Sequence, residues 1–167
     1  YTVTFTIQET PNYAGASAEA VFVIDKCPTV IDTGKLTLKF TYNGGDQSIT
    51  GATASSGAEV VYSVKTGKNA GSYPLTLSAP ETANYLGAEV SGLTVVVERK
   101  AVTIDTSGMQ KEFTYSGEEH VLSGAVSDGD GTISYSIGGR PVTGVTDAGN
   151  YTVTVTASET GNCFGAS

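Results

Sequence analysis

One sequence motif recurs in this chain and sets the period of any fold that it can adopt. Residues 71–88 combine an alternating, strand-like run with a turn-rich Glu-Thr-x-Asn-Tyr-x-Gly-Ala segment. Residues 1–17 and 151–167 carry the same motif and agree with each other at 11 of 17 positions without a gap. The tyrosine that all copies share stands at Tyr1, Tyr73 and Tyr151. The chain is therefore predicted to consist of tandem units of about 73 residues.

The repeat predicts a division into three parts. Residues 1–26 are interpreted as the C-terminal part of a preceding repeat, residues 27–99 as a complete repeat, and residues 100–167 as a second repeat that lacks its last strand. Proteins normally cover an unpaired sheet edge. We therefore expect either that the sequence is a window on a longer array, or that a neighbouring molecule supplies the strand.

The pattern of apolar residues predicts an all-β fold. Residues 1–7 and 36–42 alternate apolar and polar side chains, as a strand with one buried face does. Further predicted strands lie at residues 20–24, 48–53, 59–64, 73–78 and 93–98. Turn signals separate them at intervals typical of a β-sandwich. Pro74 falls inside one strand, which suits only an edge or a bulge.

Charge and composition exclude several classes of partner. The net charge of −8 and a pI near 4.5 argue against nucleic acid and anionic membrane surfaces, which require a basic face. No apolar run approaches the roughly 18 residues of a spanning helix, so no membrane insertion is expected. Cys27 and Cys163 are too few for a disulfide framework and, in an extended rod, are expected to lie apart and unpaired.

An insertion distinguishes the second repeat from the first. The offset between matching residues changes from 73 to 78 between Ile137 and Gly149, so a longer loop is predicted there. A variable loop on a constant scaffold is a candidate binding site. Its candidate residues are Gly139, Arg140, Pro141, Val142 and Thr143.

Several motifs of the second repeat together resemble the MBG-type repeats, which are close in character to bacterial immunoglobulin-like domains. The motifs are Thr103-Ile104-Asp105-Thr106, Phe113-Thr114-Tyr115-Ser116-Gly117, the run Asp147-Ala148-Gly149-Asn150-Tyr151-Thr152-Val153-Thr154-Val155, and the final Asn-x-x-Gly-Ala. The resemblance covers essentially the whole chain, although Cys163 replaces the usual aromatic residue. It implies tandem immunoglobulin-like β-sandwich modules in secreted or wall-anchored proteins of the bacterial surface, where they act as stalks or adhesin segments.

Candidate chemical groups mostly have a structural interpretation. His120, the only histidine, has no nucleophile and orienting acid near it in the sequence and is interpreted as a solvated loop residue. Asp128 and Asp130 are weak candidates for a cation site, but an Asp-Gly pair between strands is also a hairpin signal. Lys39 could form an isopeptide crosslink, yet Glu112 stands at its counterpart.

Recurring polar and aromatic residues are expected to serve the fold. Asn84 and Asn162 are predicted to bond to their local backbone in the turn. The tyrosines at fixed repeat positions are expected to pack in the core with their hydroxyl groups at the rim. They are Tyr42, Tyr62, Tyr73, Tyr115, Tyr135 and Tyr151.

We predict a non-catalytic stalk or spacer at the bacterial cell surface, with no cofactor. Its partners are neighbouring repeats of the same or a like chain. One alternative is an adhesin module that binds a host glycan or protein through the loop at residues 138–148. Another is a filament subunit that is completed by strand exchange.

Overall fold

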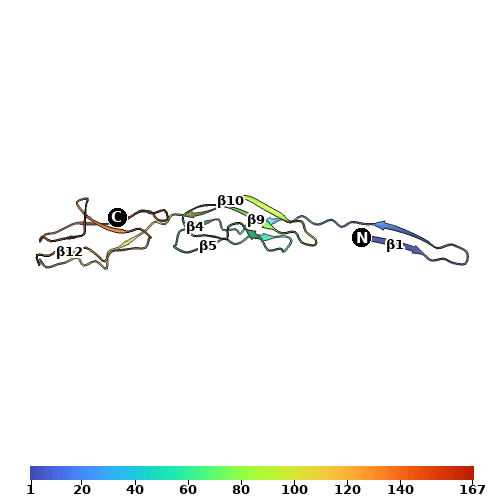
Figure 1. The fold of residues 1–167 in the computed structure, drawn as a ribbon, viewed down its shortest axis with the longest axis horizontal. Helices are drawn as coiled ribbons and strands as arrows, with labels where there is room; N and C mark the ends of the chain where they lie inside the picture. The colour runs from blue at the N-terminus through green and yellow to red at the C-terminus, as the bar shows by residue number, and fades with distance from the viewer.

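The protein is an elongated, all-β chain without helices, and a computed structural model describes all of residues 1–167. Figure 1 shows three groups of strands along one axis: an N-terminal hairpin, a first strand set and a second strand set. This architecture confirms the all-β prediction and is consistent with a β-sandwich class. The chain contains no helix long and apolar enough to cross a membrane.

Short strands separated by turns make up all three groups. The hairpin contains β1 (Thr2–Ile7) and β2 (Ala16–Val21). The first set contains β3 (Ile31–Asp32), β4 (Lys39–Thr41), β5 (Gln47–Ser48), β6 (Thr53–Ala54), β7 (Val61–Tyr62), β8 (Thr66–Gly67), β9 (Gly71–Ala79) and β10 (Ala88–Glu98). The second set contains β11 (Ile104–Asp105), β12 (His120–Val121), β13 (Val126–Ser127), β14 (Ile133–Ile137), β15 (Arg140–Val142), β16 (Gly144–Val145) and β17 (Val153–Ala157).

The two strand sets share a pattern of pairing. The first set has a sheet of order β4-β10-β9-β7 and the separate pairs β3-β6 and β5-β8. In the second set, β11-β13, β12-β16 and β14-β17 pair at the positions that correspond to β3-β6, β5-β8 and β7-β9. For example, Ile31 faces Ala54 in the first set, and Ile104 faces Ser127 at the equivalent positions of the second.

The core is densest in the first set. Alternate residues of β9 and β10 point inward, so Leu75, Leu77, Val95 and Val97 are at most 2% exposed. This follows from the period of two in a pleated strand. The buried side chains of the second set are only Leu122, Ala157 and Cys163. The difference arises because no strand of the second set takes the place that β10 has in the first.

Two predictions about local structure were wrong. The apolar strand expected at residues 20–24 begins earlier, because β2 follows the register of β1, in which Thr2 faces Val21. The loop expected at residues 138–143 is instead a tight hairpin between β14 and β15. Gly138 and Gly139 have φ of 56° and 78°, which a two-residue hairpin turn requires.

Pro74 lies at a sheet edge, as predicted from its missing N–H group. The Thr76 amide donates to the Ser63 hydroxyl, and the Thr76 carbonyl accepts from the Ser63 amide, so the backbone polar groups of Thr76 face β7. Residues two positions apart in a strand direct these groups to the same side, so the backbone nitrogen of Pro74 also faces the side on which β7 lies. The pairing of β7 with β9 covers only Leu77 and Ser78, and Pro74 is therefore beyond the end of β7.

The tyrosine prediction holds for part of the set. The hydroxyl group of half-buried Tyr62 accepts a hydrogen bond from the Ala52 amide at 3.0 Å, which confirms core packing with a polar rim. Tyr115 and Tyr151 are instead 65% and 42% exposed. They lie where the second set has no counterpart of β10, so nothing covers them.

Replacing a core side chain of β9 tests how strongly the first set depends on this packing. Leu77→Ala is expected to lower the free energy of unfolding by about 2–5 kcal/mol, because Leu77 is fully buried. The control Val61→Ala, at a position that is 51% exposed, should cost less than about 1 kcal/mol. Urea denaturation followed by NMR signals of the first set measures both, and equal losses would contradict this description of the core.

Candidate functional site

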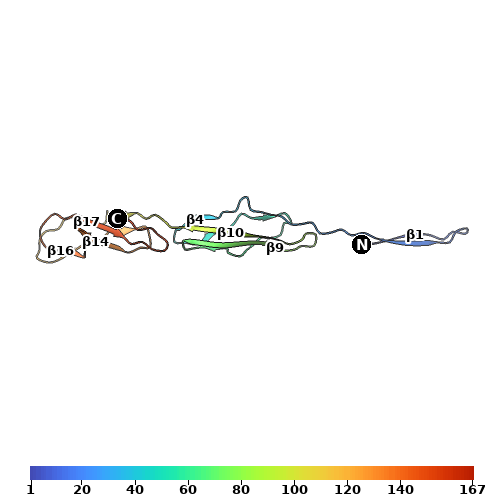
Figure 2. The ribbon, with the colours of Figure 1, turned by 90° about the horizontal axis from the view of Figure 1, so that it is seen from above.

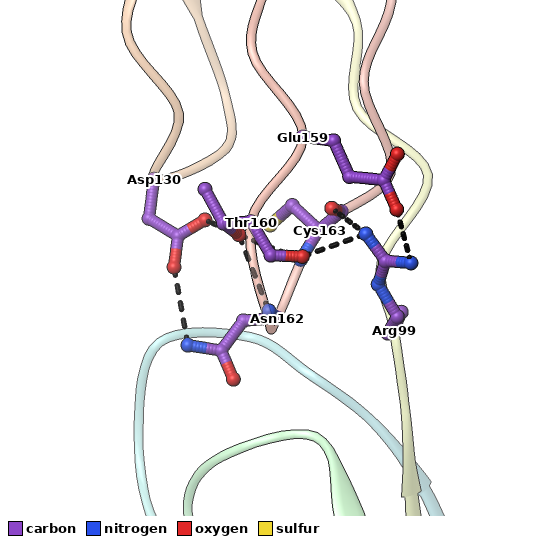
Figure 3. A network of polar contacts seen from close by, with 6 residues as sticks. All are labelled: Arg99, Asp130, Glu159, Thr160, Asn162 and Cys163. Carbon is purple, nitrogen blue, oxygen red and sulfur yellow. Dashed lines mark hydrogen bonds and ion pairs between the residues drawn. The ribbon is translucent and has the colours of Figure 1, made fainter.

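The junction between the two strand sets contains a dense group of hydrogen bonds and ion pairs. Strand β10 ends at Glu98, and the chain runs through Arg99 and Lys100 directly into the second set. There it meets the turn at residues 158–164, which belongs to the third copy of the recurring motif (Figure 3). The junction therefore joins a strand end to a turn from a distant part of the sequence, without a free linker.

Arg99 is the centre of the junction. One nitrogen of its guanidinium group lies 2.6 Å from the Glu159 carboxylate, and another donates to the Thr160 carbonyl at 2.6 Å and to the Cys163 carbonyl. The guanidinium carbon lies 4.3 Å from the centre of the Phe164 ring. Only an arginine offers a planar fork of donors and a face that stacks on an aromatic ring. Figure 3 shows the Arg99 side chain pointing toward the turn, where dashed lines join it to Glu159, Thr160 and Cys163.

The backbone reinforces the same contact. Lys100 donates its amide to the Asn162 carbonyl at 2.9 Å and accepts from the Phe164 amide at 2.9 Å, so the linker forms a parallel bridge with the turn. The Lys100 ammonium group also lies 2.9 Å from the Asp128 carboxylate. Successive linker residues are thus held by both side chain and main chain.

A second group of polar contacts crosses from the turn to the first set. Asp130 accepts from the Thr160 hydroxyl at 2.6 Å and from the Asn162 side-chain amide at 3.1 Å, and these hydrogen bonds lower the Asp130 pKa to about 2. The Asn162 side-chain oxygen accepts from the Ala70 amide at 2.9 Å. The pKa of Tyr42 is raised, mainly because the hydroxyl group is partly removed from water and to a smaller extent because of the negative charge of Asp130. Ala70 and Tyr42 belong to the first set, so Asp130 and Asn162 bridge the two sets.

A similar clamp lies between the N-terminal hairpin and the first set. Lys26 forms an ion pair with Glu81 and donates to the Thr82 carbonyl at 2.9 Å. Cys27 then makes the parallel bridge, with hydrogen bonds of 2.9 Å to Asn84 and Leu86. The arrangement of cation, ion pair and bridge is therefore a repeated feature of the chain, with lysine at one position and arginine at the other.

Asp128 and Asp130 were predicted to form either a cation site or a turn, and they lie in a turn between β13 and β14. These strands pair with different partners, so the turn is a crossover and not the hairpin that the Asp-Gly signal suggested. Asp128 accepts from the Thr103 amide at 2.8 Å, which lowers its pKa, and pairs with Lys100. The chain contains no group of three or more His, Cys, Asp and Glu side chains that could hold a metal ion.

The other candidate residues lie outside the junction network. Gly139, Arg140, Pro141, Val142 and Thr143 form the turn and outer strand of the β14-β15 hairpin and the residue after it. The structure places most of them at the surface, with Val142 half-buried. They remain a candidate binding surface, now with the shape of a β-hairpin.

His120 differs from its interpretation in the sequence, and Lys39 has an ion-pair partner. His120 is not a solvated loop residue, because it lies half-buried on β12 and its ring stacks on Phe113 at 4.8 Å. Lys39 is 71% exposed and pairs with Glu98 at 2.8 Å, a surface ion pair that is unlike the buried lysine of an isopeptide crosslink. Both cysteines are free, with Cys27 exposed and Cys163 buried.

Sequence reasoning missed the role of Arg99 and assigned Asn162 only local contacts. A signal was present, because Lys26 and Arg99 stand at equivalent positions of the repeat, and so do Glu81 and Glu159. Opposite charges that recur together can indicate a repeated contact. The pairing could not be located from spacing alone, since most of the second repeat separates Arg99 from Glu159 in the sequence.

Comparison with known proteins identifies no relative. No protein-family model matches the chain, and neither does any curated protein or solved structure. The function must therefore be argued from the junction, the cavities and the repeat.

The lowered pKa of Asp130 predicts how the junction responds to acid. The folded state favours the carboxylate, so its contribution to stability is complete above about pH 4 and is lost as the pH falls to about 2. The difference in unfolding free energy between the wild type and Asp130→Asn should therefore shrink over that interval. Acid titration combined with urea denaturation measures this difference. A difference that stays constant from neutral pH to pH 2 would contradict a role for the carboxylate charge.

Proposed function

We propose that this chain is a rod-forming segment of a stalk in a secreted or cell-surface bacterial protein of the adhesin type. In this proposal residues 27–99 and 100–167 are tandem immunoglobulin-like β-sandwich modules of about 73 residues, and residues 1–26 end a preceding module. The segment performs no catalysis and binds no cofactor. It works mechanically, by holding another domain at a distance from the cell.

The single observation that carries this proposal is the clamped junction. A spacer transmits length only when adjacent modules resist bending, and relative motion is the default for modules joined by a small interface. Here Arg99 binds three groups of the following turn, and Asn162 reaches back to the Ala70 amide. Several independent contacts must break together before the two strand sets can bend relative to each other.

The use of the ionisable residues also favours a structural function. Asp128, Asp130 and Glu159 are all engaged in hydrogen bonds or ion pairs that join separate segments. Half-buried His120 stacks on Phe113, and its ring nitrogen Nε2 lies 3.5 Å from the Ser116 hydroxyl. An acid–base site would require a placed base with an orienting partner.

Small-angle X-ray scattering of matched variants tests the stiffness of the rod. The wild type should give a narrow distribution of end-to-end distances, and Arg99→Ala should broaden it because the clamp is lost. Arg99→Lys should be intermediate, since Lys26 shows that a lysine can keep the ion pair and one carbonyl contact. A flexible Gly-Ser insertion after Arg99 supplies the fully mobile control. A wild type as broad as that control would reject the stalk mechanism.

A second candidate function is binding through the β14-β15 hairpin, which has no counterpart in the first set. Arg140 and Pro141 are exposed on its outer strand. A glycan array distinguishes the two functions when it is probed with the wild type and with a hairpin variant. In that variant, the shorter connection of the first set replaces residues 138–142. Binding that depends on the hairpin would favour an adhesin module, whereas binding by neither protein would leave the stalk as the better account.

A further inference from the structure

The chain enters and leaves the first set at opposite ends of its long axis. Figure 1 shows this set between the N-terminal hairpin and the second set, and Figure 2 shows β9 and β10 running along the same axis. The chain enters the set at Lys26 and Cys27 and leaves it at Glu98, the last residue of β10. A pull along the rod therefore acts along the strands, in the direction that slides one strand past its neighbour.

The segment that enters the first set is bonded directly to the segment that leads into β10. Cys27 donates its amide to the Asn84 carbonyl at 2.9 Å, and its carbonyl accepts from the Leu86 amide at 2.9 Å. These two hydrogen bonds form a parallel bridge, and β10 begins shortly after it. We name this contact, between residues 26–29 and 81–86, the entry clamp.

Side chains strengthen the entry clamp on both sides of the bridge. Before the bridge, Lys26 forms its ion pair with Glu81 and donates to the Thr82 carbonyl at 2.9 Å. After the bridge, the buried Thr29 donates its hydroxyl to the Leu86 carbonyl at 2.5 Å. The clamp therefore combines backbone hydrogen bonds with polar side-chain contacts that hold the same two segments.

The entry clamp gives tension a short path through the first set. A pull on Cys27 passes through the clamp to Leu86 and then along β10 to Glu98. The two bonded segments run parallel and are drawn in opposite directions, so the bonds of the clamp are stretched together and not one after another. The other strands lie outside this path for as long as the clamp holds.

A second parallel contact resists the same pull if the entry clamp opens. β4 pairs in parallel with the C-terminal part of β10. There the Leu38 carbonyl accepts from the Val96 amide at 2.8 Å, and the Tyr42 amide donates to the Glu98 carbonyl at 2.8 Å. Once the clamp has opened, the pull passes through β3 to β4 and draws β4 along β10. The two parallel contacts therefore oppose the pull in succession.

The backbone bridge of the entry clamp recurs in the second set with different side chains. Lys100 and Cys163 form it there, in place of Cys27 and Tyr85. The two hydrogen bonds are the same, since Lys100 donates to the carbonyl before Cys163 and accepts from the amide after it. The constant feature is therefore the parallel backbone geometry, which is also the feature that makes the bonds share a load.

We infer that the first set is a tension-bearing unit and that the entry clamp sets the force at which it unfolds. This role deepens the proposed stalk function and rests on it, because a stalk that connects a cell to an attached object is pulled along its axis. Forced unfolding is governed by the unfolding rate and not by the equilibrium stability. A set with a small core can therefore bear tension when a few well-placed hydrogen bonds lie in the path.

Single-molecule force spectroscopy of the intact chain in two directions of pull tests this role. Handles on Asp25→Cys and Ala101→Cys load only the first set, in the direction of the rod. Handles on Gly45→Cys and Ala101→Cys instead unzip β4 from β10, because these parallel strands end on the same side. All three attachment positions are exposed. Both proteins carry Cys27→Ser, which keeps the backbone bridge and leaves only the buried thiol of Cys163.

The pull along the rod should require at least about twice the force of the unzipping pull, because the two backbone hydrogen bonds of the clamp share the load. Complete unfolding along the rod should lengthen the tether by about 200 Å, since roughly 70 released residues span about 3.5 Å each and replace the length of the folded set. Equal forces in the two directions overturn the inference.

Matched variants separate the entry clamp from general stability. Thr29→Val removes the clamp hydroxyl and should shorten the lifetime of the set under constant tension by about three- to tenfold. Tyr62→Phe removes a hydroxyl that accepts from the Ala52 amide outside the path. It should reduce resistance to urea as Thr29→Val does, but change the lifetime under tension by less than about twofold. Equal shortening by both variants contradicts the clamp.

These measurements and the scattering test of the rod can fail separately. A rod that is stiff in solution but unfolds at the same force in both directions overturns the entry clamp and leaves the stalk proposal in place. A flexible rod whose first set resists the pull along its axis supports the clamp, although the stalk mechanism is then rejected.

Discussion

Strand β10 is the element on which the rest of the structure depends, because it completes a core and also forms the joint. Its inward residues Val95 and Val97 are among the most buried in the chain, and its last residue leads directly to Arg99. A strand set as small as this one has little core to spare, since small domains bury a low fraction of their surface. Where β10 has no counterpart, the second set keeps only three buried side chains.

The joint concentrates several different kinds of contact on one short turn. A charge-assisted contact such as that between Arg99 and Glu159 contributes little when it is isolated at a surface. Here it is combined with hydrogen bonds to two carbonyls, a stacked ring and a parallel backbone bridge on the same turn. Each contact opposes a different direction of movement, which is the basis of the proposed stiffness, and the ion pair between Lys26 and Glu81 repeats part of this arrangement before the first set.

Sequence reasoning could predict those parts of the structure that depend on local pattern. The all-β class, the edge position of Pro74 and the turn at Asp128 follow from period-two alternation, a missing N–H group and turn chemistry. It failed where a partner decided the outcome. The end of β2 was set by its pairing with β1, and His120 was placed on a strand by its pairing with Val145. For residues 138–143 it expected a loop, although Gly138 and Gly139 were available as a signal for a hairpin turn.

The sequence by itself determined where the chain can form strands and that the pattern recurs, because alternation and turn residues act over a few neighbouring positions. Only the tertiary structure decided that the recurring motif carries the joint. The sequence indicated only a strand and a locally bonded turn for that motif. In the structure, its Glu159, Thr160 and Asn162 contact Arg99, Asp130 and Ala70 from distant parts of the sequence. Contacts of that range depend on how the strands stack, and a single sequence gives the spacing of residues but not which surfaces face each other.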